Sequence, residues 1–447
     1  MKNDHPAQAI SVLNRALEIS PNDVELIVQL GQAYAAEMRW DDVENTFTSA
    51  VSRMPDNLQM RRVLGTWLLR RDHYLEALPH FEFCVVNWAE AQENSGPANV
   101  QSLLAICYIL SGDIESAERL LQSARSEAPW DLDACSGMVD LYRLSDRLEL
   151  IPELLEQYIQ LYPSLYPPYF WLASHNYYYL RQPQSALKWY QLALDRIENV
   201  EIRKYCEPYF STPDYATMLD IYLNALLDSG EDLKARTLID NIKENNKGNH
   251  GDVRFYMLQY GLSKGNFHEV EKLAIKALGA KKKNIIFWTY LAIAQEKQGK
   301  FEQAFESINQ ALTLNAESVF ALTTLASIQM NQKLWEAAIM TNQRLTELMP
   351  LSSSSIADLG ACYANTDQLD KALSLYQKVV KLDPMGADAW VDLGDIYLRL
   401  GKAELAQSAC ERGLSYEWLS PDKRAQAAKI IESIQSKQTL DDSFLIK

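Results

Sequence analysis

The sequence predicts an all-α protein built as a solenoid of antiparallel helix pairs, and three observations predict it. Small and apolar residues recur at intervals of about 34 residues through most of the chain. Glycines recur near the middle of the repeated unit, and prolines recur near its end. A unit of this length holds two helices and a tight turn, and it can bury its apolar side only against a neighbouring unit.

The C-terminal half shows the repeat most clearly, since five units follow one another without an insertion from Gly251 to Ser420. Each first helix carries a small residue where a neighbouring helix is expected to pack, and a larger side chain there would cost about 1–3 kcal/mol. These residues include Ala292, Ala326, Gly360 and Gly394, and the matching small residues of the second helices are Ala304, Ala338, Ala372 and Ala406. Glycines such as Gly299 and Gly401 are expected to end first helices, because glycine adopts a left-handed conformation at little cost.

The N-terminal half repeats this pattern with more drift and with insertions. Residues 1–23 hold a single helix with the pattern of a second helix, so the chain starts either with a cap or as a fragment of a longer protein, which is the interpretation we favour. Asn, Ser, Gly and Pro mark a polar loop at 91–98. The expected order is the leading helix 1–23, about five repeats in 24–199, an irregular insertion or hinge at 200–215, about six repeats in 216–420, a capping helix at 421–436 and a mobile tail at 437–447.

The repeated positions resemble the tetratricopeptide repeat family over roughly nine-tenths of the chain. The resemblance implies a right-handed superhelix in which the first helices line a concave groove. It also implies that the protein works by binding a peptide or a partner protein in that groove. The sequence therefore predicts a scaffold or adaptor.

The groove residues follow from the register of the first helices, and they form a mixed, lightly polar set. Such a set suits an extended peptide held by side-chain hydrogen bonds, although it specifies no peptide sequence. The candidate partner-binding residues are Arg62, Thr66, Asp140, Ser174, Tyr177, Tyr178, Asn224, Gln259, Thr289, Glu296, Thr323, Ser327 and Asn365.

Family members that hold the acidic tails of Hsp70 or Hsp90 use a clamp of Lys, Asn and Arg on successive first helices. Only Asn224 agrees with that clamp. The other corresponding positions carry Asp220, Phe255, Thr289, Thr323 and Ala357. The clamp is absent from the sequence, so a chaperone tail is disfavoured as the partner.

An aromatic cluster in the middle of the chain is the least regular feature of the sequence. It contains Tyr158, Tyr162, Tyr166, Tyr169, Phe170, Trp171, Tyr177, Tyr178, Tyr179, Trp189 and Tyr190. Packing accounts for Trp171, Trp189 and Tyr190, which stand at core spacing. Three consecutive tyrosines cannot all face one side of a helix, so at least one of Tyr177–Tyr179 is expected in the groove or in solvent, where tyrosine often binds partners.

Composition and motifs exclude several functions. A net charge of −16 disfavours nucleic acid as a partner. No phosphate-binding loop, HExxH or GxSxG motif occurs, and the combination of His73, His80 and Cys84 is a poor zinc site, so we expect no catalytic residue, no cofactor and no metal.

The six cysteines form no CxxC pair and suit a reducing compartment. No apolar stretch is long enough to span a membrane, and a cytoplasmic location is expected.

Two alternative functions stay open. The chain could be the non-catalytic regulatory or substrate-recruiting region of a larger enzyme such as a transferase, as the half-repeat start suggests. It could also be a peptide-sensing regulator that closes about the Asn199–Asp214 insertion.

Overall fold

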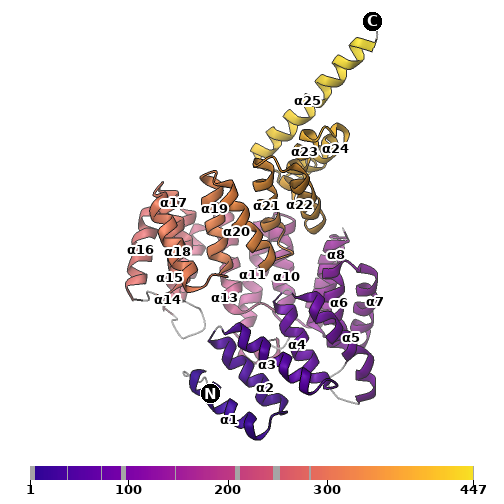
Figure 1. Ribbon diagram of the computed structural model, residues 1–447, viewed down its shortest axis with the longest axis vertical. Coiled ribbons are helices and arrows are strands. Elements are labelled where there is room, and N and C mark those ends of the chain that lie inside the picture. The colour runs from indigo at the N-terminus through magenta and orange to yellow at the C-terminus, as the bar shows by residue number, and fades with distance from the viewer. Residues whose placement is uncertain are drawn as a thin grey trace. The chain divides into compact units, whose positions relative to one another are not determined.

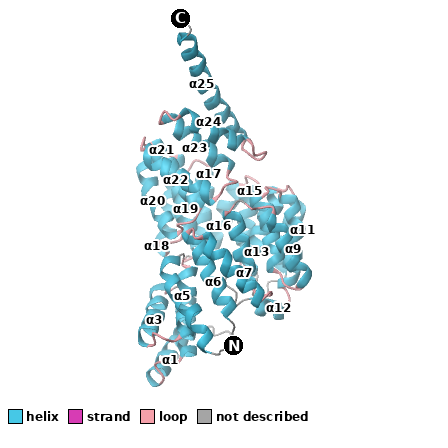
Figure 2. Ribbon diagram, turned by 90° about the vertical axis from the view of Figure 1, so that its right-hand side faces the viewer, coloured by secondary structure: helices cyan, strands magenta, loops and turns pink. Residues whose placement is uncertain are grey.

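A computed structural model describes all residues except 1–5, 38, 72, 92–96, 146, 207–211, 245–251, 281–282 and 446–447. The described residues form 25 α-helices, one of them interrupted at its end by a π-helical turn, and no strand (Figure 2). This result confirms the predicted all-α class. Most of the predicted 91–98 loop and the middle of the predicted 200–215 insertion lie outside the described residues.

The chain divides into two compact units, which we describe separately. Unit 1 contains residues 1–168 and 199–212, and unit 2 contains residues 169–198 and 213–447. The helices of unit 1 are α1 (Pro6–Ile19), α2 (Val24–Ala36), α3 (Trp40–Arg53), α4 (Leu58–Arg70), α5 (Tyr74–Ala91), α6 (Pro97–Ser111), α7 (Ile114–Glu127), α8 (Leu132–Leu144), α9 (Leu150–Leu161) and α12 (Val200–Cys206).

Unit 2 begins within α10 (Pro167–Ser174), which continues into the π-helical turn η1 (His175–Tyr179). Its other helices are α11 (Pro183–Ile197), α13 (Tyr215–Asp228), α14 (Asp232–Glu244), α15 (Val253–Ser263), α16 (Phe267–Ala280), α17 (Ile285–Lys297), α18 (Phe301–Leu314), α19 (Val319–Asn331), α20 (Trp335–Leu348), α21 (Ser353–Asn365), α22 (Leu369–Leu382), α23 (Ala387–Arg399), α24 (Ala403–Leu414) and α25 (Pro421–Leu445). Figure 1 shows α17 to α20 as neighbouring helices that alternate in direction.

Five helix pairs turn at a glycine, as the glycine pattern predicts. Gly112, Gly230, Gly265, Gly299 and Gly401 have φ values between 70° and 88°, in the left-handed region where a side chain is strained. Non-glycine residues take this conformation in three other pairs, at Arg181, Lys333 and Asp367. The turn is therefore a fixed part of the repeat, and glycine makes it less strained without being indispensable.

Small residues of the first helices lie directly under large residues of the second. A Cβ atom added to Gly31 would stand 2.3 Å from the Phe47 ring, and one added to Gly360 would stand 3.1 Å from the Tyr376 ring. Where the first helix carries alanine, as at Ala292, the second helix presents the aliphatic Ile308 instead, and both residues are fully buried. The repeated small residues thus allow the close helix contact that the sequence predicts.

The last described helix covers the apolar side of the final pair. Ala427, Ile430 and Ile434 of α25 are buried in one cluster with Val391 and Tyr416. The helix takes in all of the predicted capping segment 421–436 and continues to Leu445. In the predicted insertion at 200–215, the structure has the short helix α12. All six cysteines are buried and free of disulfides, as their core-like positions predict.

Candidate protein-binding site

Five of the predicted groove residues lie on neighbouring elements at the start of unit 2, namely Ser174, Tyr177, Tyr178, Asn224 and Gln259. Asp220 of α13, Tyr256 of α15 and Tyr290 of α17 complete the site. We call the region formed by Tyr177, Tyr178, Asp220, Asn224, Tyr256, Gln259 and Tyr290 the polar–aromatic face, in which Tyr256 and Tyr290 are buried. It is carried by η1 and by the first helices α13, α15 and α17.

The π-helical turn η1 decides where the three consecutive tyrosines point. The turn closes with a hydrogen bond from the Leu180 amide to the His175 carbonyl, and Arg181 follows with φ of 53°. A π-helical turn holds an extra residue and often marks a functional site. Tyr177, Tyr178 and Tyr179 follow one another in this turn and point to different sides of the helix.

Each tyrosine of the turn has a different environment. The Tyr177 hydroxyl donates to a carboxylate oxygen of Asp228 on α13. The Tyr179 ring stacks on His175 at 6.0 Å. The Tyr178 ring lies 4.6 Å from the Tyr177 ring and is 42% exposed. The expectation that at least one of the three reaches solvent is therefore confirmed for Tyr178.

A cluster of amide and carboxylate groups lies on α13 and α15. The Gln259 Nε2 atom donates to Asp220 Oδ1 at 2.8 Å and to Asn224 Oδ1 at 2.7 Å. The other end of this amide, Gln259 Oε1, is buried and has no hydrogen-bond partner within the part of the chain that the structure describes. Burial raises the pKa of the Asp220 carboxyl, because the charged form is poorly solvated there. One acceptor of the cluster, Gln259 Oε1, thus lacks a donor among the described residues.

Aromatic rings extend the face along the next first helices. The Tyr290 ring stands edge-on to Phe255 at 5.6 Å and to Phe320 at 5.4 Å. Burial raises the pKa of Tyr256 and Tyr290, and the negative charge of Asp220 raises both further. For Tyr178 the causes of a raised pKa are burial and then the charges of Asp220 and Asp228. The potential at the face is therefore negative.

The remaining predicted residues of unit 2 lie further along its helices. Thr323 and Ser327 are exposed on α19, and Asn365 is exposed on α21, where its side chain donates to the Ala361 carbonyl. Glu296 is half-buried and accepts from Asn331 at 2.9 Å. Two predicted residues are buried: Thr289 donates to the Ile285 carbonyl, and Ser174 Oγ lies 3.3 Å from Tyr190 Oη. Their side chains are occupied within the fold.

Arg62, Thr66 and Asp140 belong to unit 1, and all three are half-buried. Thr66 donates to the Arg62 carbonyl, and Asp140 pairs with Arg143 at 2.9 Å. Arg62 Nε is buried and makes no hydrogen bond within the described residues. These three residues are therefore described with unit 1 alone.

Sequence reasoning left Asp220, Tyr256 and Tyr290 out of the candidate set. The signal for Asp220 was present, because it stands one helical turn before Asn224 and so shares its side of α13. Tyr256 and Tyr290 stand in the same register of successive repeats. Their role on the face depends on the side-chain packing of Phe255 and Phe320, which the register alone does not give.

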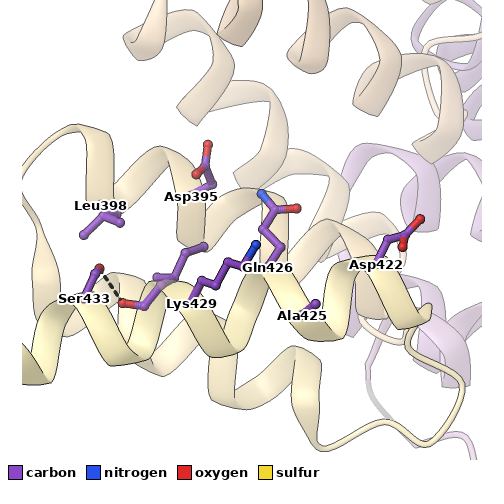
Figure 3. Close-up of a pocket in the computed structure, with 8 residues that line it drawn as sticks. Asp395, Leu398, Asp422, Ala425, Gln426, Lys429 and Ser433 are labelled. Atoms are coloured by element: carbon purple, nitrogen blue, oxygen red, sulfur yellow. Dashed lines mark hydrogen bonds between the residues drawn. The ribbon is translucent and has the colours of Figure 1, made fainter.

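A second polar site lies near the C-terminus of unit 2. An open pocket of about 470 Å³ is lined by Asp395 and Leu398 of α23 and by six residues of α25 (Figure 3). Next to it, Lys423 of α25 forms an ion pair with Asp392 of α23. Here the final helix supplies its own cation to a carboxylate of a first helix.

Comparison with known proteins agrees with the helix pairs. Three tetratricopeptide repeat models match residues 1–65, 362–401 and 387–417. No curated protein sequence matches the chain. The stacked pairs define an α-solenoid of the class that serves as a protein-interaction scaffold. The three matches support a tetratricopeptide repeat protein.

Several solved structures are similar in fold. MamA residues 41 to the end from Desulfovibrio magneticus RS-1 is 19% identical, covering 36% of this chain and 92% of that one, with a TM-score of 0.34. YrrB, described as a TPR protein with an unusual peptide-binding site, is 20% identical over 42% of this chain and 95% of that one, with a TM-score of 0.34. Yeast Tom70 is 16% identical over 98% of this chain and 94% of that one, with a TM-score of 0.46.

Two further findings concern catalysis and membrane crossing. No catalytic family is indicated by the models that match, and family members are generally non-catalytic scaffolds. Across the described residues, no helix has the length and apolar character that a membrane crossing requires.

Proposed function

We propose that the protein is an adaptor that binds an extended segment of a partner protein on the polar–aromatic face of unit 2. The observation that carries the proposal is the buried Gln259 Oε1, which lacks a partner among the described residues while it lies beside Asp220 and Asn224. A buried polar atom without a hydrogen bond costs about 1–3 kcal/mol. A partner that donates a hydrogen bond there would remove this cost.

The surroundings of that atom support a peptide as the ligand. An extended segment presents a backbone N–H group at every residue except proline, so it supplies donors to the Gln259 and Asp220 oxygens. The exposed Tyr178 and Phe320 and the half-buried Phe255 provide a surface for apolar side chains, and the buried Tyr290 ring packs against both phenylalanines. Tyrosine is enriched among residues that dominate binding energies.

We also propose a reducing compartment, such as the cytoplasm, as the place where the adaptor acts. The six buried free thiols support this, because disulfides are rare in such compartments.

Photo-crosslinking tests the proposed site. p-Benzoyl-phenylalanine in place of Tyr178 is expected to crosslink a partner in the native host, and mass spectrometry of the adduct would identify the partner and the bound segment. The control places the same group at Met340, which is 72% exposed on the second helix α20 of the same unit. The proposal fails when both positions give the same adducts, or when adducts form only at Met340.

A competition arm makes this result specific. A synthetic peptide with the crosslinked sequence is expected to suppress the adduct at Tyr178, and Tyr178→Ala is expected to weaken its binding about tenfold, the loss typical of a central aromatic contact. Met340→Ala should leave the affinity within about twofold.

A further inference from the structure

We infer that the polar–aromatic face recognises a basic segment, and that Asp220 accepts the ammonium or guanidinium group of a lysine or arginine of the partner. This inference rests on the proposed function and adds the chemistry of the ligand.

Asp220 is a carboxylate without a cation. It is half-buried on α13 and accepts one hydrogen bond, from Gln259 Nε2. The described residues give Asp220 no ion pair with any lysine, arginine or histidine. A partly buried carboxylate that lacks a counter-charge destabilises the fold, so its presence on an open face calls for a cation from outside.

The neighbours of Asp220 offer acceptors and π faces. Gln259 Oε1 has no partner among the described residues and can accept a further N–H of the same cation. Tyr178 is 42% exposed, and the charge of Asp220 acts on Tyr178, Tyr256 and Tyr290 alike. Of these three rings only Tyr178 is exposed; the charge of Asp220 attracts a cation toward it, and the tyrosine face adds about 0.5–2 kcal/mol of cation–π attraction.

Another first helix of unit 2 already holds a cation in this way. Asp392 of α23 stands in the repeat register of Tyr256 and Tyr290, and its carboxylate pairs with Lys423 of α25. The cation there comes from the chain itself. Asp358 of α21, in the same register, resembles Asp220 because it is half-buried, its pKa is raised by burial, and no ion pair forms with it within the described residues. First helices of unit 2 thus carry one carboxylate that is paired with a lysine and two that, within the described residues, are not, although Asp220 stands one repeat position before Asp358 and Asp392.

An acidic segment is the competing occupant, and the face opposes it. Asp220 and Asp228 would repel a carboxylate, and no lysine or arginine of the clamp stands at the corresponding positions. The sign of the ligand charge is therefore the quantity to measure.

The test pans a phage-displayed library of random dodecapeptides on the whole chain, on Asp220→Asn and on Asp240→Asn. Asp240 is exposed on the second helix α14, so its substitution makes the same charge change away from the face. Lysine or arginine is expected to be enriched on the native chain and on Asp240→Asn, and this enrichment is expected to disappear on Asp220→Asn.

Affinities of one selected peptide then define the contact. Asp220→Asn is expected to weaken binding about tenfold, and replacement of the peptide's lysine by acetyl-lysine should cost the native chain about as much. The acetylated peptide should bind Asp220→Asn no more weakly than it binds the native chain, since both changes remove the same contact. Circular dichroism of the variants checks that they fold.

Three outcomes overturn the inference: selection of neutral or acidic peptides, equal affinities of Asp220→Asn and Asp240→Asn, or no selected peptide at all. Neutral or acidic peptides whose binding is lost in Tyr178→Ala would leave the proposed function intact. Failure of crosslinking at Tyr178 would remove both.

Discussion

The regular pair α21–α22 and the irregular segment formed by α10, η1 and α11 use tyrosine in opposite ways. Tyr376 of α22 is 3% exposed, because it fills the space over Gly360 of α21. Tyr178 lies in the π-helical turn and is 42% exposed. A tyrosine that faces a small residue across a regular pair becomes core, and one on a distorted turn becomes available to a partner.

The comparison also separates stability from recognition. In the regular pairs, glycine or alanine in one helix is matched by a larger residue in the other, so the side chains fit closely. In the irregular segment, Tyr177 bonds to Asp228 on the next first helix, α13. On α15, one acceptor of the polar–aromatic face, Gln259 Oε1, has no donor among the described residues. The exposed tyrosine thus lies in the irregular segment, whereas the unsatisfied acceptor lies on α15, outside that segment.

The largest predicted effect tests the role of the regular tyrosine. Tyr376→Ala is expected to destabilise unit 2 by about 3–5 kcal/mol, since it leaves a cavity over Gly360. Tyr178→Ala should cost less than about 1 kcal/mol, because its side chain is largely exposed. Urea unfolding followed by circular dichroism measures both.

Ser374→Ala is the matched control for the first substitution, since Ser374 is exposed on the same helix, α22. It should leave the unfolding midpoint unchanged. Equal destabilisation by Tyr376→Ala and Tyr178→Ala would show that the two tyrosines do not differ in the way the structure indicates.

A smaller effect tests size matching in unit 1. Gly31→Ala places a Cβ atom against the Phe47 ring, and overpacking costs about 1–3 kcal/mol while the gain in helix propensity is about 1 kcal/mol. We expect a net loss of about 1 kcal/mol. Adding Phe47→Leu should recover most of it, because the pair then matches Ala105 and Leu121, which are both fully buried in α6 and α7.

Thermal unfolding of the single and double variants measures the coupling. A double variant less stable than Gly31→Ala alone would argue that Phe47 has a role besides filling the space over Gly31. Gly112→Ala is the control, because a Cβ atom added there would meet no neighbour. It is expected to destabilise the chain only through the strained φ of 88° at that position.

The repeat made the fold predictable, and its departures limited prediction of the site. The spacing of residues such as Gly360 and Ala372 specifies both helices and the contact between them, because many copies repeat the same constraint. The π-helical turn at His175–Tyr179 has no such repetition. Register also placed Thr289 in the groove, whereas the structure buries its side chain against the Ile285 carbonyl. Register fixes where a residue stands along the helix, and the neighbouring side chains decide whether it is accessible.

The smallest predicted effect concerns the stability that the chain loses because the Asp220 carboxyl is partly buried. The pKa of Asp220 is raised by burial, so this carboxyl ionises at a higher pH in the folded chain than in the unfolded chain. Its contribution to stability is therefore greatest at low pH and is lost as the pH rises through the folded pKa. Asparagine cannot ionise and keeps an acceptor for Gln259. Asp220→Asn is thus expected to be more stable than the native chain at pH 7, by less than about 1 kcal/mol.

The pH dependence distinguishes this explanation from a general effect of charge. The advantage of Asp220→Asn should shrink toward zero below about pH 4, where the native carboxyl is protonated in both the folded and the unfolded chain. Asp240→Asn, an exposed substitution with the same charge change, should show no such dependence. Unfolding midpoints at pH 7 and pH 4 measure the difference. A loss of stability at pH 7 in Asp220→Asn would mean that the charged carboxylate supports the fold. Asp220 of α13 would then stabilise unit 2, as the side chains of the regular pairs do.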